Sequence, residues 1–189
     1  MKHMDDGVPW RDFWLLLAVF LASSFAGYAT GVHSPEGALQ AVRRIMERMG
    51  PLSDSSFHNF VKIFVNNSMV ALLMFLSGLF FGLGPWFITA FNGLVVGIVV
   101  FVVHDLRGLP MNRVLLALIP HGIVEIPAFA IAGVAGITWY VELAKGEGEA
   151  AERFKKGFVK GFKLYLLSVA LLLVAALIEA YITPQVADL

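Results

Sequence analysis

The segment IPHGIVEIPAFAIAGVAG, residues 119–136, decides the fold because it is almost wholly apolar yet carries two ionisable residues. His121 and Glu125 are four positions apart, which places both side chains on one face of a helix. Pro120 and Pro127 bracket the pair and cannot donate backbone hydrogen bonds, so two nearby carbonyl groups lose their helical partners. Inside a bilayer such a pair is a candidate functional site, and a polar contact that locks helices together is the structural alternative.

The composition indicates that this segment lies in a lipid bilayer. Of the 189 residues, 58% are hydrophobic and only 15% are charged, whereas soluble domains average about 45–50% apolar and about 25% charged residues. The formal net charge is zero, so no nucleic-acid partner is expected. The chain has no cysteine, which excludes disulfides, thiolate metal ligands and cysteine nucleophiles. At this length we expect a single integral membrane domain over residues 1–189.

Five apolar runs are long enough to cross a hydrocarbon core of about 30 Å, and they predict an all-α, polytopic transmembrane helix bundle. We place the spans at about 13–32, 61–83, 86–103, 114–141 and 162–182. Asp5 and Asp6 dilute the basic charge before the first run, which favours a retained span over the alternative, a cleavable signal peptide. A straight helix over the fourth run would measure about 42 Å, so we expect its prolines to kink or break it; tilt is the alternative.

Two charged segments are expected to form amphipathic helices at the membrane surface. The first starts at Ser34-Pro35, a typical helix start, ends at Gly50 and has an apolar stripe opposite its charged face. A solvated helix packed on neighbouring loops is the alternative for this segment. The second covers residues 142–161, where phenylalanines including Phe158 recur on one side.

The distribution of lysine and arginine gives an expected orientation. Five spans place the two termini on opposite sides of the membrane. With the N-terminus inside, eight basic residues face the cytoplasm and six lie on the other side. The basic run at 153–160, directly before the last span, is the clearest signal. We therefore expect a cell-membrane protein with a cytoplasmic N-terminus and an external C-terminus.

The few polar residues inside the predicted spans are expected to converge, because separated polar groups would each need a partner in a nearly partnerless medium. His58, Lys62 and Asn66 recur every fourth residue and lead into the span. The candidate binding cluster consists of Asn66, Asn67, Asn92, His121, Glu125 and Glu179. It could bind a proton or a divalent metal, the metal through the histidine and the two glutamates, or it could simply cement the bundle.

Small residues at four-residue spacing predict close contacts between helices, because only small side chains let two backbones approach in a lipid environment. Ala128, Ala132 and Gly136 form one such series. The glycines expected at helix contacts are Gly78, Gly82, Gly93, Gly97 and Gly136.

Signatures of familiar enzymes are absent from the sequence. It contains no His-Glu-x-x-His, no Gly-x-Ser-x-Gly and no Walker glycine loop. Enzyme activity is therefore not the expected function, and a metal-dependent intramembrane hydrolase is the less favoured alternative.

Several motifs, in order over roughly residues 55–184, resemble the stage II sporulation protein M family. They are Phe64-Val65-Asn66-Asn67, Gly78 to Gly82, Asn92-Gly93, Pro120-His121-Gly122 with Glu125-x-Pro127, and Ile178-Glu179-Ala180. The resemblance implies a small polytopic membrane protein whose family positions coincide with the polar cluster. In spore-forming bacteria the family's namesake anchors a peptidoglycan-degrading complex, and relatives also occur in bacteria and archaea that form no spores.

Two classes of function remain open. The first is a membrane scaffold that anchors a multiprotein complex, with other membrane proteins or a second copy of the chain as partners beside the lipid bilayer. The second is a small-solute or ion transporter, a channel or an enzyme that works at the polar cluster. A water-filled cavity that reaches His121 would favour the second class, and a dry, mutually satisfied cluster beside a large apolar patch would favour the first.

Overall fold

The computed structural model describes residues 9–50 and 53–187, so Asp5 and Asp6 lie outside the described part. These residues are almost wholly helical, and none of them forms a strand. The α-helices are α1 (Trp10–His33), α2 (Pro35–Met49), α3 (Ser56–Ser77), α4 (Gly84–Phe101), α5 (Met111–Lys145), α6 (Ala150–Leu177) and α7 (Thr183–Ala187). Two π-helical segments, η1 (Val102–Leu106) and η2 (Ile178–Ile182), continue α4 and α6.

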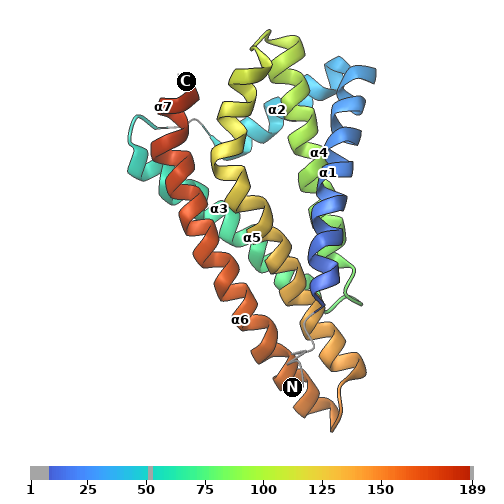
Figure 1. The fold of residues 1–189 in the computed structure, drawn as a ribbon. Coiled ribbons are helices and arrows are strands. Elements are labelled where there is room, and N and C mark those ends of the chain that lie inside the picture. The colour runs from blue at the N-terminus through green and yellow to red at the C-terminus, as the bar shows by residue number, and fades with distance from the viewer. Residues whose placement is uncertain (1–8, 51–52, 188–189) are drawn as a thin grey trace, which may run out of the picture.

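Five helices are long and apolar enough to cross a membrane, which confirms the expected helical, multi-pass architecture. They are α1, α3, α4 with η1, α5, and α6 with its C-terminal extension. Figure 1 shows that consecutive long helices run in alternating directions, so that α1 begins and α7 ends at opposite ends of the bundle. The short α2 lies at the end of the bundle where α1 finishes.

The bundle contains two tightly packed helix pairs, α5 with α6 and α1 with α4; α3 packs on the first pair, and α5 also contacts both helices of the second. Helix α5 makes its largest contact with α6, and α1 makes its largest contact with α4. Gly93 and Gly97 of α4 lie directly against the backbone of α1, where a methyl group would collide with the carbonyl oxygens of Phe20 and Ser24. The small-residue spacing on α4 therefore lies at a helix contact.

Small residues also lie where α3 approaches α5. A methyl group on Gly78 would collide with the backbone of Gly136. Ala128 and Ala132, two turns and one turn before Gly136, are fully buried and belong to a core cluster with residues of α3 and α6. The predicted series of small residues on α5 is thus the surface on which two neighbouring helices pack.

The structure places Gly82 differently from the expectation of a helix-to-helix contact. Helix α3 ends at Ser77, and Gly82 lies in the following turn with φ +73°, a left-handed conformation that glycine adopts without strain. A methyl group on Gly82 would lie 3.2 Å from the ring of Tyr140. Glycine is needed here for the turn, because the chain must reverse within a few residues before α4.

The prolines were expected to kink or break the fourth span, and the structure shows that helix α5 is not broken. It continues as one helix of 35 residues through Pro120 and Pro127. Figure 1 shows that the ribbon changes direction in its yellow part, near these prolines. A proline removes one backbone hydrogen bond and bends a helix, while the other backbone hydrogen bonds can continue through it.

The charged segment 142–161, expected to form a surface helix that leads into the fifth span, is divided between two helices in the structure. Helix α5 extends to Lys145, and α6 begins at Ala150 and continues into the fifth span without a break. The two helices form a hairpin that projects beyond the other helices (Figure 1). Phe158 packs against Trp139 and Phe75, with ring centroids 5.1 and 6.0 Å apart, so this aromatic face meets protein.

Charged side chains close this hairpin. The carboxylate of Glu142 on α5 accepts from Lys156 at 3.0 Å and from Lys160 at 2.7 Å, both on α6. This end of α5 and α6 is therefore held by ion pairs where the apolar contacts thin out.

Candidate functional site

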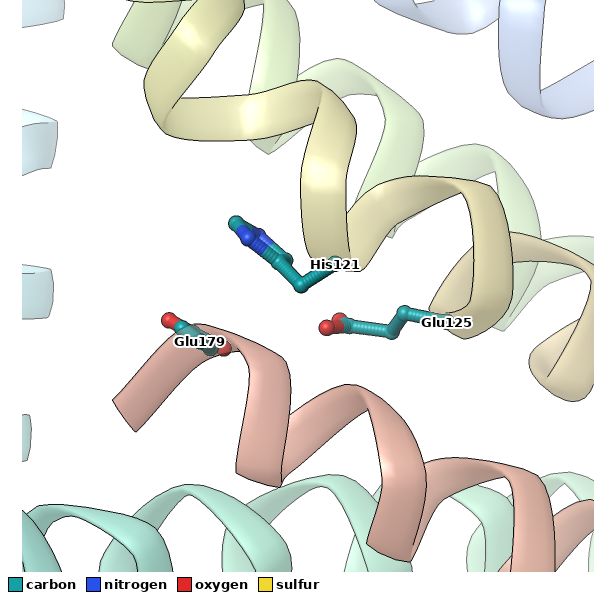
Figure 2. Close-up of side chains that lie close together, drawn as sticks. All are labelled: His121, Glu125 and Glu179. Carbon is teal, nitrogen blue, oxygen red and sulfur yellow. The ribbon is translucent and has the colours of Figure 1, made fainter. Parts of the chain in front are cut away.

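The centre of the polar cluster is formed by one histidine and two glutamates. His121 and Glu125 lie on α5, and Glu179 lies in η2 at the end of α6. One potential ligand atom from each side chain lies within 4.8 Å of the other two. Figure 2 shows His121 and Glu125 extending from α5 towards Glu179 on the facing segment. The three residues are half-buried.

Local backbone structure explains why these side chains meet. The four-residue spacing of His121 and Glu125 places them one turn apart on the face of α5 that looks towards α6. Glu179 is carried by a π-helical segment, which has more residues per turn than an α-helix. The π-helical turn changes the direction in which the last residues of α6 present their side chains, and π-turns occur frequently at functional sites.

Helix α3 contributes an amide to the cluster. The side chain of Asn67 is buried and interacts with the Glu125 carboxyl. Asn66 donates from its amide to the Asn67 side-chain oxygen at 3.3 Å, but its own side chain is exposed on the outer surface of α3. Asn67 therefore belongs to the inner cluster, and Asn66 connects that cluster to the outside of the bundle.

Asn92 lies on the other side of the cluster and does not join it directly. Its amide donates to the carbonyl oxygen of Ile88 at 2.8 Å, within α4. Asn92, His121 and Glu125 line a common pocket of about 100 Å³, together with residues such as Phe20. The structure thus brings His121, Glu125, Glu179 and Asn67 together, and it separates Asn92 from them by this pocket.

Thr183 is a neighbour that the sequence analysis did not select. Its hydroxyl oxygen lies 3.5 Å from Nδ1 of His121, and the residue is buried. Thr183 follows Glu179 by four positions, so the same helical spacing that identified the pair on α5 could have indicated it. A threonine directly before Pro184 reads as a helix-start residue, which hid this signal.

The electrostatics of the cluster are unfavourable for the protein alone. The Glu125 carboxyl lies close to the Glu179 carboxyl and to His121, and it interacts with the Asn67 amide. Two close carboxylates in apolar surroundings repel each other and lose hydration unless a proton or a cation is shared between them. The arrangement therefore has the chemistry of a cation- or proton-binding site.

The donor set also fits a divalent metal ion. Two carboxylates and one imidazole provide oxygen and nitrogen ligands that suit several divalent metals, among them Mn²⁺ and Zn²⁺. Atoms that share an ion bonded at about 2.0–2.6 Å lie at most about 4–5 Å apart. The spacing within 4.8 Å reaches this range with small side-chain adjustments. Asn67 and Thr183 are placed to orient the ligands.

The fold and the site together define a polytopic α-helical membrane protein with an ionisable centre between α3, α5 and α6. The family model described as Stage II sporulation protein M matches residues 16–184. The chain therefore belongs to the Stage II sporulation protein M family, which confirms the resemblance found in its motifs.

Two archaeal proteins from Methanocaldococcus jannaschii are similar to the chain. Uncharacterized protein MJ0793 is 38% identical over 135 residues, which cover 68% of this chain and 73% of that protein. Uncharacterized protein MJ0706 is 25% identical over 142 residues, which cover 73% of this chain and 62% of that protein. The chain thus spans less than two thirds of the second relative. No solved structure matches the chain.

Proposed function

We propose that this family member binds a divalent cation at His121, Glu125 and Glu179 and works as an ion transporter or channel. The observation that supports the proposal best is the meeting of two carboxylates and an imidazole within 4.8 Å inside a membrane-spanning bundle. A purely structural contact would gain little from two neighbouring carboxylates, because burying charge without a counter-charge destabilises a bundle.

The pocket beside the cluster supports a working site over a purely structural one. It reaches both His121 and Glu125 and has a volume of about 100 Å³, which is enough for several water molecules. Its remaining walls come from α1 and α4, as at Phe20 and Asn92. The pocket would give an ion room to keep part of its hydration shell while the protein supplies three ligands.

A binding and transport experiment tests this proposal. The full chain in neutral detergent is freed of metal and titrated with Mn²⁺ by calorimetry, then reconstituted into vesicles that contain a Mn²⁺-sensitive dye. We expect Glu125→Gln and Glu179→Gln to abolish binding and uptake while the folded protein is retained. Glu152→Gln, which changes an exposed glutamate on α6, is the matched control. Wild-type protein that binds no divalent cation would contradict the proposal.

A scaffold role is the second candidate, and an apolar groove on the far side of the bundle favours it. The groove lies between α1 and α4, has a volume of about 420 Å³ and is lined by residues such as Leu21, Phe25 and Val100. Phe25 is 77% exposed, so its ring is offered to lipid or to a helix of another membrane protein. Cysteine crosslinking at position 25 in native membranes tests this role, since a scaffold should give a discrete crosslinked partner.

The proposed orientation places the N-terminus in the cytoplasm and the C-terminus outside. It is supported by the excess of basic residues on the N-terminal side and by the basic start of α6. Reporter fusions at both termini test it, and an external N-terminus would contradict it.

A further inference from the structure

A second polar surface lies outside the cation site, where the C-terminal end of α2 meets the start of α3. It is a groove of about 560 Å³, within the range of about 300–1,000 Å³ that small-molecule pockets occupy. Arg48, His58 and Lys62 line its polar part, and the described residues of its wall include no carboxylate. The polar end of the groove is therefore basic.

The two helices that form the groove are tied together at its polar end. Lys62 of α3 donates to the carbonyl oxygen of Gly50, the residue that ends α2, at 2.9 Å. This bond holds the end of α2 against the first turns of α3, so that Arg48 and His58 are presented side by side on an exposed surface. The basic groups are thus positioned by the fold and are not spread along a mobile segment.

The rest of the groove is apolar and opens outwards. Val61, Val65 and Met69 follow the groove along α3, and they are 40%, 55% and 54% exposed. In a membrane-spanning helix such side chains face lipid chains. Asn66 lies between them and is exposed; its amide donates one hydrogen bond to Asn67, and an amide offers a second N–H and an acceptor oxygen for a further partner. The groove is therefore amphipathic along its length, with the basic end at the start of the span.

We propose that this groove binds an anionic phospholipid, with the phosphate against Arg48, His58 and Lys62 and an acyl chain along Val61, Val65 and Met69. Charge complementarity selects the headgroup, because arginine and lysine form charge-assisted hydrogen bonds with phosphate oxygens. The order of basic and apolar residues along the groove selects an amphiphile. The basic end lies where the membrane span of α3 begins, and the apolar part continues towards the middle of that span. Asn66 contacts the bound lipid near its glycerol backbone.

This lipid site is separate from the cation site but is connected to it. Asn66 faces the groove and donates to Asn67, which interacts with Glu125. A lipid that engages the Asn66 amide can therefore influence the orientation of Asn67 without touching the ionisable centre. The lipid proposal does not rest on the proposed function, since it requires no bound cation.

Lipid binding to the purified full chain tests the proposal. The protein is held in neutral detergent, and the affinities for phosphatidylglycerol and phosphatidylcholine are compared by native mass spectrometry. We expect phosphatidylglycerol to bind more tightly, and Arg48→Gln to weaken it about fivefold, the effect of one basic group near a lipid surface. Arg43→Gln is the matched control, because Arg43 lies exposed on the same helix outside the groove lining. Added salt should weaken binding by the wild type more than by the variant.

Further measurements separate this lipid site from its alternatives. Glu125→Gln should keep the preference for phosphatidylglycerol over phosphatidylcholine, even where it abolishes Mn²⁺ binding, so failure of one proposal is distinguishable from failure of the other. Equal affinity for the two lipids would overturn the proposal, as would equal losses in Arg48→Gln and Arg43→Gln. Inorganic phosphate that competes fully at millimolar concentration would also overturn it, because the site would then recognise a free anion and not an amphiphile.

Discussion

Gly78, directly after α3, and Gly136, on α5, touch backbone to backbone, with no room for even a methyl group between them. This contact fixes the distance between α3 and α5 below the cation site. It also limits how far Asn67 can stand from Glu125, because these two residues lie on α3 and α5.

Replacing Gly78 by alanine should destabilise the bundle. The added methyl group would force α3 and α5 apart, and overpacking of this kind costs about 1–3 kcal/mol. Thermal unfolding in detergent measures the effect. Gly122→Ala on α5 is the control, because its methyl group would meet only the end of Ile126, at 3.8 Å. An unchanged melting temperature for Gly78→Ala would mean that the contact is not tight.

The two adjacent asparagines of α3 should differ in their effect on cation binding. Asn67→Leu removes the amide that interacts with Glu125, and loss of such a supporting group typically weakens metal affinity about 10–100-fold. Asn66→Leu should change Mn²⁺ affinity much less, because the Asn66 side chain faces the outer groove. Calorimetric titration of both variants measures the difference. Equal losses of Mn²⁺ affinity would contradict the assignment of Asn67 to the inner cluster and of Asn66 to the outer surface.

Ser168→Ala should weaken the contact between α5 and α6. The Ser168 hydroxyl is fully buried and donates to the carbonyl oxygen of Ala128 at 2.7 Å. Loss of a buried hydrogen bond typically costs about 1 kcal/mol. Chemical or thermal unfolding checks this value. Ser24→Ala, whose hydroxyl bonds only within α1 to Phe20, should cost less.

The ion pairs at the α5–α6 hairpin should make stability depend on pH. The Glu142 carboxylate pairs with Lys156 and Lys160 only while it is ionised. This contribution is therefore present at neutral pH and is lost as acid protonates the carboxyl. Melting temperatures of wild type and Glu142→Gln, compared from neutral to acidic pH, measure it. The difference between the two proteins should shrink towards acid.

The sequence allowed the spans and much of the site to be predicted because both depend on short-range patterns. Apolar runs long enough for a bilayer located the five membrane helices. The spacing of His121 and Glu125 predicted that they share one face, and the high cost of isolated polar groups in lipid predicted that Glu179 lies near them; in the structure ligand atoms of the three lie within 4.8 Å.

The remaining features depend on tertiary contacts that no local pattern reveals. Helix α5 stays continuous through Pro120, where the sequence pattern allowed either a kink or a break. The phenylalanine stripe around Phe158 was expected to face the membrane surface, but Phe158 packs against Trp139. A stripe of phenylalanines suits lipid and protein equally well, so the sequence pattern did not distinguish the two. Asn92 has a backbone acceptor in its own helix, so it did not need the cluster to satisfy its amide.

Glu179, one of the three potential ligands, lies in the π-helical segment η2. The direction of its side chain therefore depends on a single extra residue in a helical turn. A segment with i→i+5 bonding returns to ordinary α-helix when one residue is removed. The span over α6 would survive such a deletion almost unchanged, whereas Glu179 would be carried about a quarter of a turn around the helix axis. The ionisable centre can thus be gained or lost by an insertion or deletion of one codon, with the membrane topology left intact.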